Sequence, residues 1–226
     1  MSKDPEDVAV IVQARLSSQR CPQKMTRDFA GTTLMDICLK KLLNSRIPNK
    51  NIIACVHEKE LIDICSQYPI SIFVRSQKSA NSEGTPMTEM YEWWNKIKFT
   101  HAVLVNACTP FLAKESIEKF FCDYCHTKSN GMFGVMEKKN YFWDQDGKFL
   151  TPLTEAVMNT KTAKVVKEAA HCLYASRLDS IGRNVWMGDF NKKDDIELFS
   201  IPEEQCLDID YEWQFKAYSS LYESIK

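Results

Sequence analysis

The first 136 residues alternate between short apolar runs and longer segments with helical periodicity. Residues 8–13 are almost wholly apolar, which is typical of a strand buried on both faces of a parallel sheet. The same patterns predict strands at 51–56, 70–74, 102–106 and 131–136, and helices at 33–43, 59–67 and 114–125. A further helix is expected to open with Thr85 as its cap and Pro86 at its first position. This order predicts a parallel sheet with helices on both faces.

The alternation of predicted strands and helices ends after residue 136. Aromatic segments at 141–143 and 148–150 flank a turn with Asp146 and Gly147 at its tip, which predicts a hairpin. Such an arm could cover its own sheet or pair with a second subunit. Later strands are predicted at 172–175, 196–200 and 207–210, followed by a closing helix at 212–225. No Pro-, Gly- or Ser-rich linker divides the chain, so residues 1–226 are expected to form a single domain.

Composition and charge remove several classes of function. Apolar residues make up 44% and charged residues 26% of the 226, which is ordinary for a globular chain. The 29 Lys and Arg and 30 Asp and Glu give a net charge of -1, so no overall positive field attracts nucleic acid or an anionic membrane. No apolar run approaches the ~18 residues of a membrane span, and the N-terminus does not resemble a signal peptide. We therefore expect a cytoplasmic protein with no nucleic-acid or membrane partner, in which any anion site is local.

The nine cysteines are an odd number without a repeated pair spacing, which indicates reduced thiols. Cys122, Cys125 and His126 spell the pattern of c-type haem attachment, and they could equally be three zinc ligands. They fall on a predicted amphipathic helix, where cysteines usually pack as small apolar residues. No second CxxC completes a zinc site, and haem attachment requires export. The pattern is therefore interpreted as structural.

The loop after the first strand is strongly basic. Between Asp7 and Asp28 the chain has no carboxylate. Ligands of open α/β sheets bind beyond the carboxyl ends of the strands, so cations in this loop predict an anion site, most plausibly for phosphates. The alternative is a solvated basic loop. Ser17 and Ser18 add donors, but the loop lacks the glycine that lets backbone amides approach a phosphate closely. Its four cations are Arg15, Arg20, Lys24 and Arg27.

A pair of carboxylates lies near the C-terminus. Side chains at i and i+2 of a strand share a face, so Asp208 and Asp210 are expected to point the same way, with Ile209 buried behind them. Mg²⁺ takes one or two protein carboxylates together with water and phosphate oxygens, which makes this pair a candidate Mg²⁺ site. An Asp-x-Asp can equally be a pair of solvated acids at a strand end.

A third polar segment follows a central predicted strand. Asn106 and Thr109 lie at its carboxyl end, and Pro110 turns the chain there. This is where a substrate of an open α/β sheet is expected.

Together these segments resemble a known family. Ala14-Arg15-x-x-Ser18-x-Arg20-x-Pro22-x-Lys24 resembles the opening signature of cytidylyltransferases of the CMP-sialic acid synthetase type, also called acylneuraminate cytidylyltransferases. Residues 106–111 are similar to the family's strand-end turn, and residues 208–210 followed by a helix are similar to its C-terminal Asp-Ile-Asp signature. Residues 74–82 resemble the segment of the family that contacts the base of the nucleotide. The resemblance runs from about residue 8 to residue 217.

The resemblance implies a Rossmann-like three-layer α/β/α nucleotidyltransferase domain with a mostly parallel central sheet and a small hairpin arm. It implies an enzyme that uses CTP and Mg²⁺ to convert an acidic keto-sugar to its CMP-sugar with release of pyrophosphate. It also implies a homodimer whose arm, at about 138–164, reaches toward the partner. The expected roles are nucleotide binding for Ala14, Arg15, Ser18, Arg20, Lys24, Arg75 and Ser82, substrate binding for Asn106 and Thr109, metal binding for Asp208 and Asp210, and catalysis for Arg15, Lys24, Asp208 and Asp210.

Some positions depart from the family pattern and leave the acceptor open. Ser17 stands where a glycine is usual, and Phe111 and Leu112 stand where a polar or basic residue usually touches the sugar. An octulosonic acid, a sugar phosphate or a phosphonate is therefore an alternative acceptor. His171 replaces a usually small residue and is interpreted as a core or rim histidine. A non-catalytic nucleotide-binding relative is the alternative from another functional class.

Overall fold

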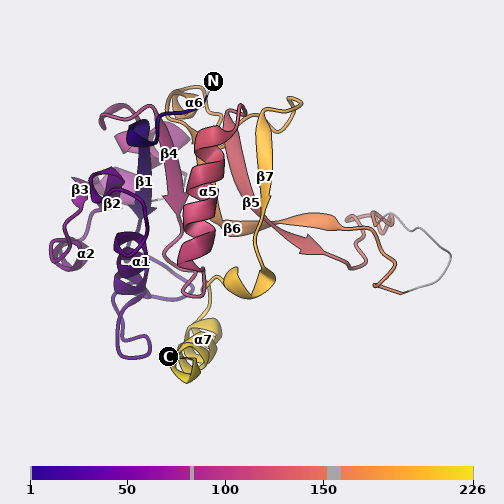
Figure 1. The fold of residues 1–226 in the computed structure, drawn as a ribbon. Coiled ribbons are helices and arrows are strands. Elements are labelled where there is room, and N and C mark those ends of the chain that lie inside the picture. Colours follow the sequence, from indigo (N-terminus) through magenta and orange to yellow (C-terminus); the bar gives the residue numbers. More distant parts are fainter. Residues whose placement is uncertain (1, 82–83, 152–158, 226) are drawn as a thin grey trace.

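The computed structural model describes residues 2–81, 84–151 and 159–225. Its centre is a seven-stranded sheet in the order β3-β2-β1-β4-β6-β5-β7 (Figure 1). Neighbouring strands are parallel except at β6, which is antiparallel to both β4 and β5. The prediction of a mostly parallel sheet is therefore confirmed. The strands are β1 (Val8–Gln13), β2 (Ile52–Val56), β3 (Ser71–Val74), β4 (His101–Val105), β5 (Gly131–Lys138), β6 (Val166–Arg177) and β7 (Ile196–Ser200).

Helical segments connect the strands and cover the sheet. Short 3₁₀ turns lie at Pro5–Asp7, Asn49–Asn51, Glu92–Asn95 and Glu203–Gln205. The predicted helices at 33–43, 59–67, 114–125 and 212–225 are confirmed, with small shifts at their ends. Thr33 caps the first of them by accepting a hydrogen bond from the backbone N–H of Asp36. The α-helices are α1 (Leu34–Leu43), α2 (Lys59–Cys65), α3 (Gln77–Ala80), α4 (Met87–Met90), α5 (Lys114–His126), α6 (Asp179–Gly182) and α7 (Glu212–Ser224).

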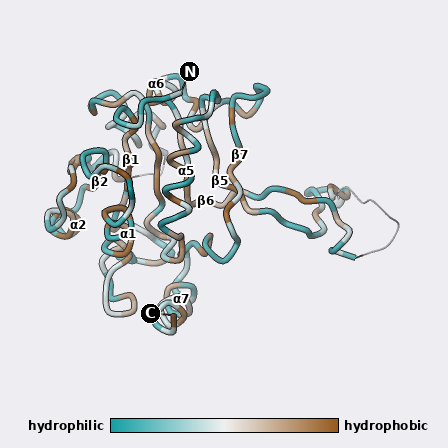
Figure 2. Tube along the Cα trace, in the orientation of Figure 1, coloured by the Kyte–Doolittle hydropathy of each residue, from teal (hydrophilic) through white to brown (hydrophobic). Residues whose placement is uncertain are grey.

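The core lies on both faces of the sheet, as β1 shows. Val8, Val10 and Val12 pack into the larger apolar cluster, which includes residues of α1, α5 and α7. Ala9 and Ile11 point the other way, into a smaller cluster that contains Trp93 and residues of α6. The apolar colouring along the inner strands in Figure 2 follows this burial. Alternate residues of one apolar run thus hold two layers of helices against the sheet.

The predicted hairpin forms an arm beyond β5 and β6. Asp144 Oδ1 accepts the backbone N–H groups of Asp146 and Lys148, and Trp143 pairs with Phe149 across the turn. Figure 1 shows this arm extending away from the sheet rather than covering it. Residues 152–158 of the predicted arm lie outside the described part of the chain.

Two sequence predictions of local structure are wrong. Residues 207–210 form no strand, because Ile209 N–H donates to the Cys108 carbonyl and no ladder of hydrogen bonds follows on either side. The helix predicted to start at Pro86 is a single turn that starts at Met87, and Thr85 does not cap it because its hydroxyl donates to the Asn81 carbonyl instead. In the described residues no helix has the length and apolarity needed to cross a membrane.

Candidate functional site

A cleft of about 690 Å³ opens at the carboxyl ends of the central strands. Gln13 is the last residue of β1, Arg75 follows β3, and Cys108 follows β4. This is the edge at which open α/β sheets bind their ligands. The lining residues are Gln13, Ala14, Arg15, Ser17, Ser18, Gln19, Arg20, Lys24, Met25, Arg75, Asn81, Met90, Cys108 and Asp210.

The basic loop after β1 forms one wall of this cleft. Its start is fixed by the backbone N–H of Leu16, which donates to Glu58 Oε1 at 2.8 Å, and by the N–H of Ala14, which donates to the Cys55 carbonyl. Gln23 has a φ of 54°, a left-handed conformation that turns the chain back toward the sheet. The loop therefore lies across the strand ends, with Arg15 and Ser18 along the cleft.

Lys24 joins this loop to the segment that contains the two acids. Its side chain is 11% exposed, its ammonium donates to the Ile209 carbonyl, and its Nζ lies 3.6 Å from Asp210 Oδ1. Burial lowers the pKa of Lys24, but the neighbouring Cys108 thiol, Asp208 and Asp210 outweigh burial and leave the pKa raised. Lys24 is thus a buried, permanently charged cation at the floor of the cleft.

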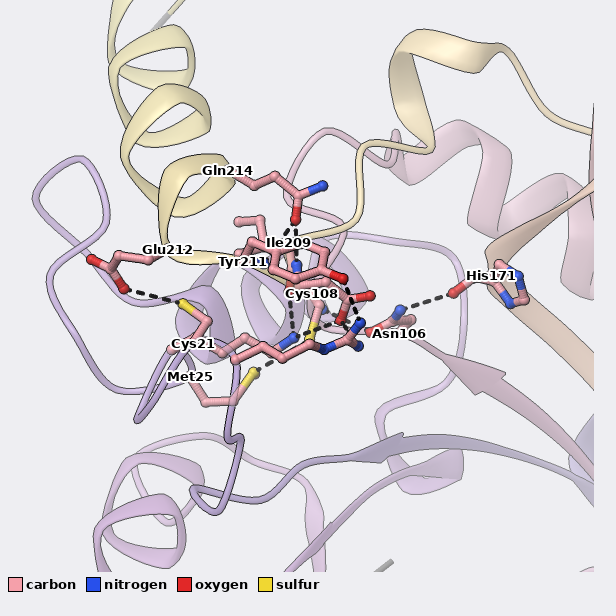
Figure 3. Close-up of polar contacts among 12 residues, drawn as sticks. Cys21, Met25, Asn106, Cys108, His171, Ile209, Tyr211, Glu212 and Gln214 are labelled. Carbon is pink, nitrogen blue, oxygen red and sulfur yellow. Dashed lines mark hydrogen bonds and ion pairs between the residues drawn. The ribbon is translucent and has the colours of Figure 1, made fainter.

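Arg20 reaches the same carboxylate from the rim. Its Nη2 lies 2.9 Å from Asp210 Oδ1, and its guanidinium stacks on the ring of Tyr211 with the carbon 4.9 Å from the centroid. The more exposed Arg20 therefore shares one acid with the buried Lys24. Figure 3 shows Ile209, Tyr211 and Cys108 gathered at this junction.

Asp208 has an unusual environment. Its Oδ1 is buried and accepts no hydrogen bond. Burial raises the pKa of this carboxyl, the charge of Lys24 opposes that rise, and the charge of Asp210 adds to it. A buried carboxylate oxygen without a partner, beside a second carboxylate, suits a hard cation that brings its own water and phosphate ligands. Asp208 and Asp210 are the two carboxylates here that could hold a metal ion; the described residues contain no group of three or more His, Cys, Asp or Glu side chains placed to do so.

Ile209, between the two acids, is fully buried, as predicted. It belongs to the larger apolar cluster. The backbone N–H groups of Asp210 and Tyr211 both donate to Gln214 Oε1 at 2.8 Å, which ties the segment to the first turn of α7. The acids therefore keep fixed positions although no strand contains them.

Of the four cations predicted to bind phosphate, Arg27 has a different role. It makes two hydrogen bonds of 2.8 Å to Glu212, and its guanidinium lies 4.2 Å from the ring centroid of Phe215. It does not line the cleft, because its charge is used to hold α7 against the loop. The sequence placed it near the other cations but could not show that Glu212, 185 residues later, binds it.

Arg75 lies in the cleft wall as a buried side chain that is 3% exposed. Its guanidinium donates to Ser79 Oγ at 3.0 Å and to the backbone carbonyls of Ala14, Ser79 and Met90. These bonds draw β1, α3 and α4 together around the cleft. Arg15 donates to the Ala80 carbonyl at 3.4 Å on the same side. Ser82, predicted with Arg75 as a nucleotide contact, lies outside the described residues.

The strand-end turn after β4 is built from its own polar groups. Thr109 is 3% exposed, and its hydroxyl donates to the Asn106 carbonyl at 2.7 Å. Asn106 donates to the His171 carbonyl at 2.8 Å and accepts the N–H of Cys108 at 2.9 Å, contacts that Figure 3 shows in part. Neither predicted substrate contact lines the cleft: they form the turn that places Cys108 there.

His171 lies in a bulge of β6. Its φ is 52°, and between Ala169 and Tyr174 the pairing with β5 shifts register. The side chain is exposed, and its Nδ1 lies 3.0 Å from the Tyr174 hydroxyl. His171 is therefore a rim residue, close enough to Asp208 to act on the charge of that carboxyl.

Sequence patterns did not identify Gln13, Met90 and Cys108 as cleft residues. Gln13 ends an apolar run, and Met90 ends the short helix α4, 77 positions later, so neither carries a local signal of a binding site. Burial raises the pKa of Cys108 to about 11, which keeps it a neutral thiol beside Lys24. The complete cleft thus has a charged part, with Arg20, Lys24 and Asp210, and a second part around Gln13 and Met90, where the buried Arg75 is the cation of the wall.

Comparison with solved structures agrees with this architecture. At 11% identity, a CMP:2-keto-3-deoxy-manno-octonic acid synthetase complexed with CTP superposes with a TM-score of 0.72, covering 97% of this chain and 100% of that chain. A 4-diphosphocytidyl-2C-methyl-D-erythritol synthase from Anaerococcus prevotii gives 0.67 at 13% identity, with the same coverage. A cytidylyltransferase from Leptospira borgpetersenii gives 0.59 at 13% identity, with 95% and 85% covered. The fold is therefore the α/β nucleotidyltransferase fold expected from the sequence.

Sequence comparison identifies the family. A search of curated protein sequences gave no match. The family model described as cytidylyltransferase matches residues 9–184, which include the basic loop, the strand-end turn and the arm. With the fold and the cleft at the strand ends, this match shows that the chain belongs to the cytidylyltransferase family.

Proposed function

We propose that this protein is a CTP-dependent cytidylyltransferase that converts an acidic keto-sugar, of the sialic acid-like nonulosonic class, to its CMP-sugar and releases pyrophosphate. The observation that carries the proposal is the convergence of Arg20 and Lys24 on Asp210 at one end of the cleft, with the unpartnered Asp208 oxygen beside them. Cations for a triphosphate and carboxylates for its metal thus meet in one place.

The cations of the loop bind the triphosphate. Lys24 is fixed by the Ile209 carbonyl and offers a rigid charge, while Arg20 is exposed and can exchange Asp210 for phosphate oxygens. Arg15 lies nearer the part of the cleft around Gln13 and Met90, beside Ala80. Ser18 adds a hydroxyl along the same wall, while its backbone N–H already donates to the Leu16 carbonyl at 2.8 Å. Fixed donors of this kind offset the negative charge that develops on the phosphoryl oxygens during transfer.

Transfer needs an acceptor hydroxyl in line with the leaving pyrophosphate. The anomeric hydroxyl of the sugar acid attacks the α-phosphorus and releases its proton to solvent water. The bond between the α-phosphorus and the oxygen bridging to the β-phosphate breaks, and pyrophosphate leaves with its charge held by Arg20 and Lys24. Asp208 and Asp210 would hold Mg²⁺, which supplies charge compensation and lowers the pKa of a coordinated hydroxyl. Buried Ile209 and the Gln214 contacts keep the two carboxylates in place.

A second acceptor class has specific support. The similar synthetase named above acts on 2-keto-3-deoxy-manno-octonic acid, according to its description. This is also an acidic keto-sugar, so the same phosphate and metal groups serve both acceptors. Phe111 does not face the cleft in this chain, because its ring packs edge-on against Tyr218 and Tyr222. Phe111 is therefore not a contact that selects the acceptor.

The direct test is pyrophosphate release from each nucleoside triphosphate with Mg²⁺ and a panel of nonulosonic, octulosonic, sugar phosphate and phosphonate acceptors. We expect release with CTP and one acidic keto-sugar. The control is Asp208→Asn, which keeps the side-chain shape but removes the charge and should abolish release. Absence of release with every acceptor, while CTP still binds, would favour the non-catalytic alternative.

We also propose that the protein is a homodimer held by its arm. Trp143 is 54% exposed and Leu150 is also exposed, although Tyr141, Trp143 and Phe149 contact one another. An apolar arm that extends away from its own sheet is a surface for a second subunit. Light scattering on the purified chain should give twice the mass of 26.1 kDa, and a monomeric mass would refute this role.

A further inference from the structure

Gln13 occupies a distinctive position at the end of β1. It lines the cleft and is half-buried, in the second part of the cleft, which also contains Met90, Asn81 and the Arg75 guanidinium. The phosphate-binding cations Arg20 and Lys24 converge on Asp210 in the other part. If the triphosphate occupies the charged part, the base of the nucleotide lies beside Gln13.

Trp93 fixes the orientation of the Gln13 amide. The indole Nε1 of Trp93 lies 2.7 Å from Gln13 Oε1. An indole N–H can only donate, so its partner must be the amide oxygen and cannot be the amide nitrogen. Trp93 itself is 0% exposed and packs against the rings of Tyr91 and Trp186, which prevents it from moving away. The amide of Gln13 is therefore held in one of its two orientations.

This orientation leaves the NH₂ group of Gln13 for a ligand. Among the described residues, Gln13 Nε2 has no hydrogen-bond acceptor. Arg75, the neighbouring polar side chain of the wall, already makes four hydrogen bonds to Ser79, Ala14 and Met90. Gln13 is thus a side-chain donor whose hydrogens are unused and whose direction is set by a buried group.

We propose that Gln13 is a specificity-determining residue that selects cytosine over uracil, and that Trp93 is its positioning residue. Cytosine has an acceptor at N3, which an NH₂ group directed at that position can satisfy. Uracil has an N–H at position 3, so the same NH₂ group would meet a second donor. Sites built to form a hydrogen bond reject a base that leaves that bond unmade. This inference rests on the proposed function, since it concerns the base of the nucleotide substrate.

The test compares the dissociation constants of CTP and UTP by isothermal titration of the full chain with Mg²⁺. We expect the wild type to prefer CTP by about tenfold or more, which is the usual consequence of leaving one buried hydrogen bond unmade. In Gln13→Glu one carboxylate oxygen accepts from Trp93 and the other faces the base as an acceptor. This variant should reverse the preference, because uracil N3–H then finds an acceptor.

Two further variants separate selection from other effects. Gln19→Glu adds the same charge to the exposed loop wall of the cleft. It should weaken both nucleotides and leave their ratio unchanged. Trp93→Phe removes the indole N–H that, among the described residues, fixes the amide, so the ratio should fall toward one because Gln13 can then turn its oxygen to uracil. Thermal melting shows whether Trp93→Phe remains folded.

The outcomes distinguish this inference from the proposed function. CTP binding with an unchanged ratio in Gln13→Glu would overturn the role of Gln13 and leave the cytidylyltransferase proposal intact. A wild type that binds neither nucleotide would overturn both. If Gln13→Glu binds neither nucleotide, the ratio of the UTP and CTP dissociation constants of Trp93→Phe is the deciding measurement. A ratio equal to the wild-type value refutes the role of the fixed amide.

Discussion

The attachment of α7 to the basic loop gives a quantitative prediction. Phe215 of α7 is 4% exposed and lies edge-on to Phe29, with centroids 5.3 Å apart, while the Arg27 guanidinium covers its other side. Replacing a buried Phe by Ala costs about 3–5 kcal/mol, and the lost contact with the Arg27 cation adds roughly 0.5–1 kcal/mol at a partly exposed site. We expect Phe215→Ala to lower the free energy of unfolding by about 4 kcal/mol.

Urea unfolding followed by circular dichroism measures this loss. With a denaturant slope of about 3 kcal/mol per molar urea, the midpoint should fall by roughly 1 M or more. The matched control is Trp213→Ala on the same helix: Trp213 is 64% exposed, so its loss should change stability by no more than about 0.5 kcal/mol. Equal midpoints for the two variants would refute the conclusion that Phe215 anchors α7.

Three further outcomes are expected. Lys24→Met should lower kcat/KM for pyrophosphate release by about 100-fold or more, because a fixed cation on the transferring phosphate is lost, and steady-state kinetics with an unchanged melting temperature would confirm this role. Because burial raises the pKa of Asp208 in the metal-free protein, the folded state without Mg²⁺ should lose stability as the pH rises above the usual Asp range. Asp208→Asn should remove that loss of stability, and melting curves that keep the wild-type pH dependence would contradict it. Trp143→Asp should convert a dimer to a monomer in light scattering, and an unchanged mass would exclude the arm as the interface.

The fold was predictable because its signals are local. The run at 8–13 is apolar at every position except the last, and a strand covered on both faces requires such a pattern. Helices α1 and α5 show their buried faces as spaced apolar residues, so their ends were predicted to within about one turn. Residues 207–210 were misassigned for the same reason: buried Ile209 between two acids alternates like a strand, but the pattern cannot show that no neighbouring strand is available.

The site was predictable only in part, because many of its contacts join distant residues. The motifs that resemble those of the family identified three charged residues, Arg20, Lys24 and Asp210, and the structure brings them together. Arg27 looked equivalent to the other cations until Glu212 was found to bind it. The orientation of Gln13 depends on Trp93, 80 positions away, and no local pattern contains that information.

The two walls of the charged part of the cleft come from opposite ends of the chain, since Lys24 and Ile209 are 185 positions apart. Contacts of this range close a very long loop, and they form late because the chain entropy must be lost before the contact stabilises anything. During synthesis the basic loop emerges first and remains without its acidic partners until the last strand and turn are complete. The order of translation thus delays assembly of the cleft, and no intermediate that lacks residues 207–210 has both walls of its charged part.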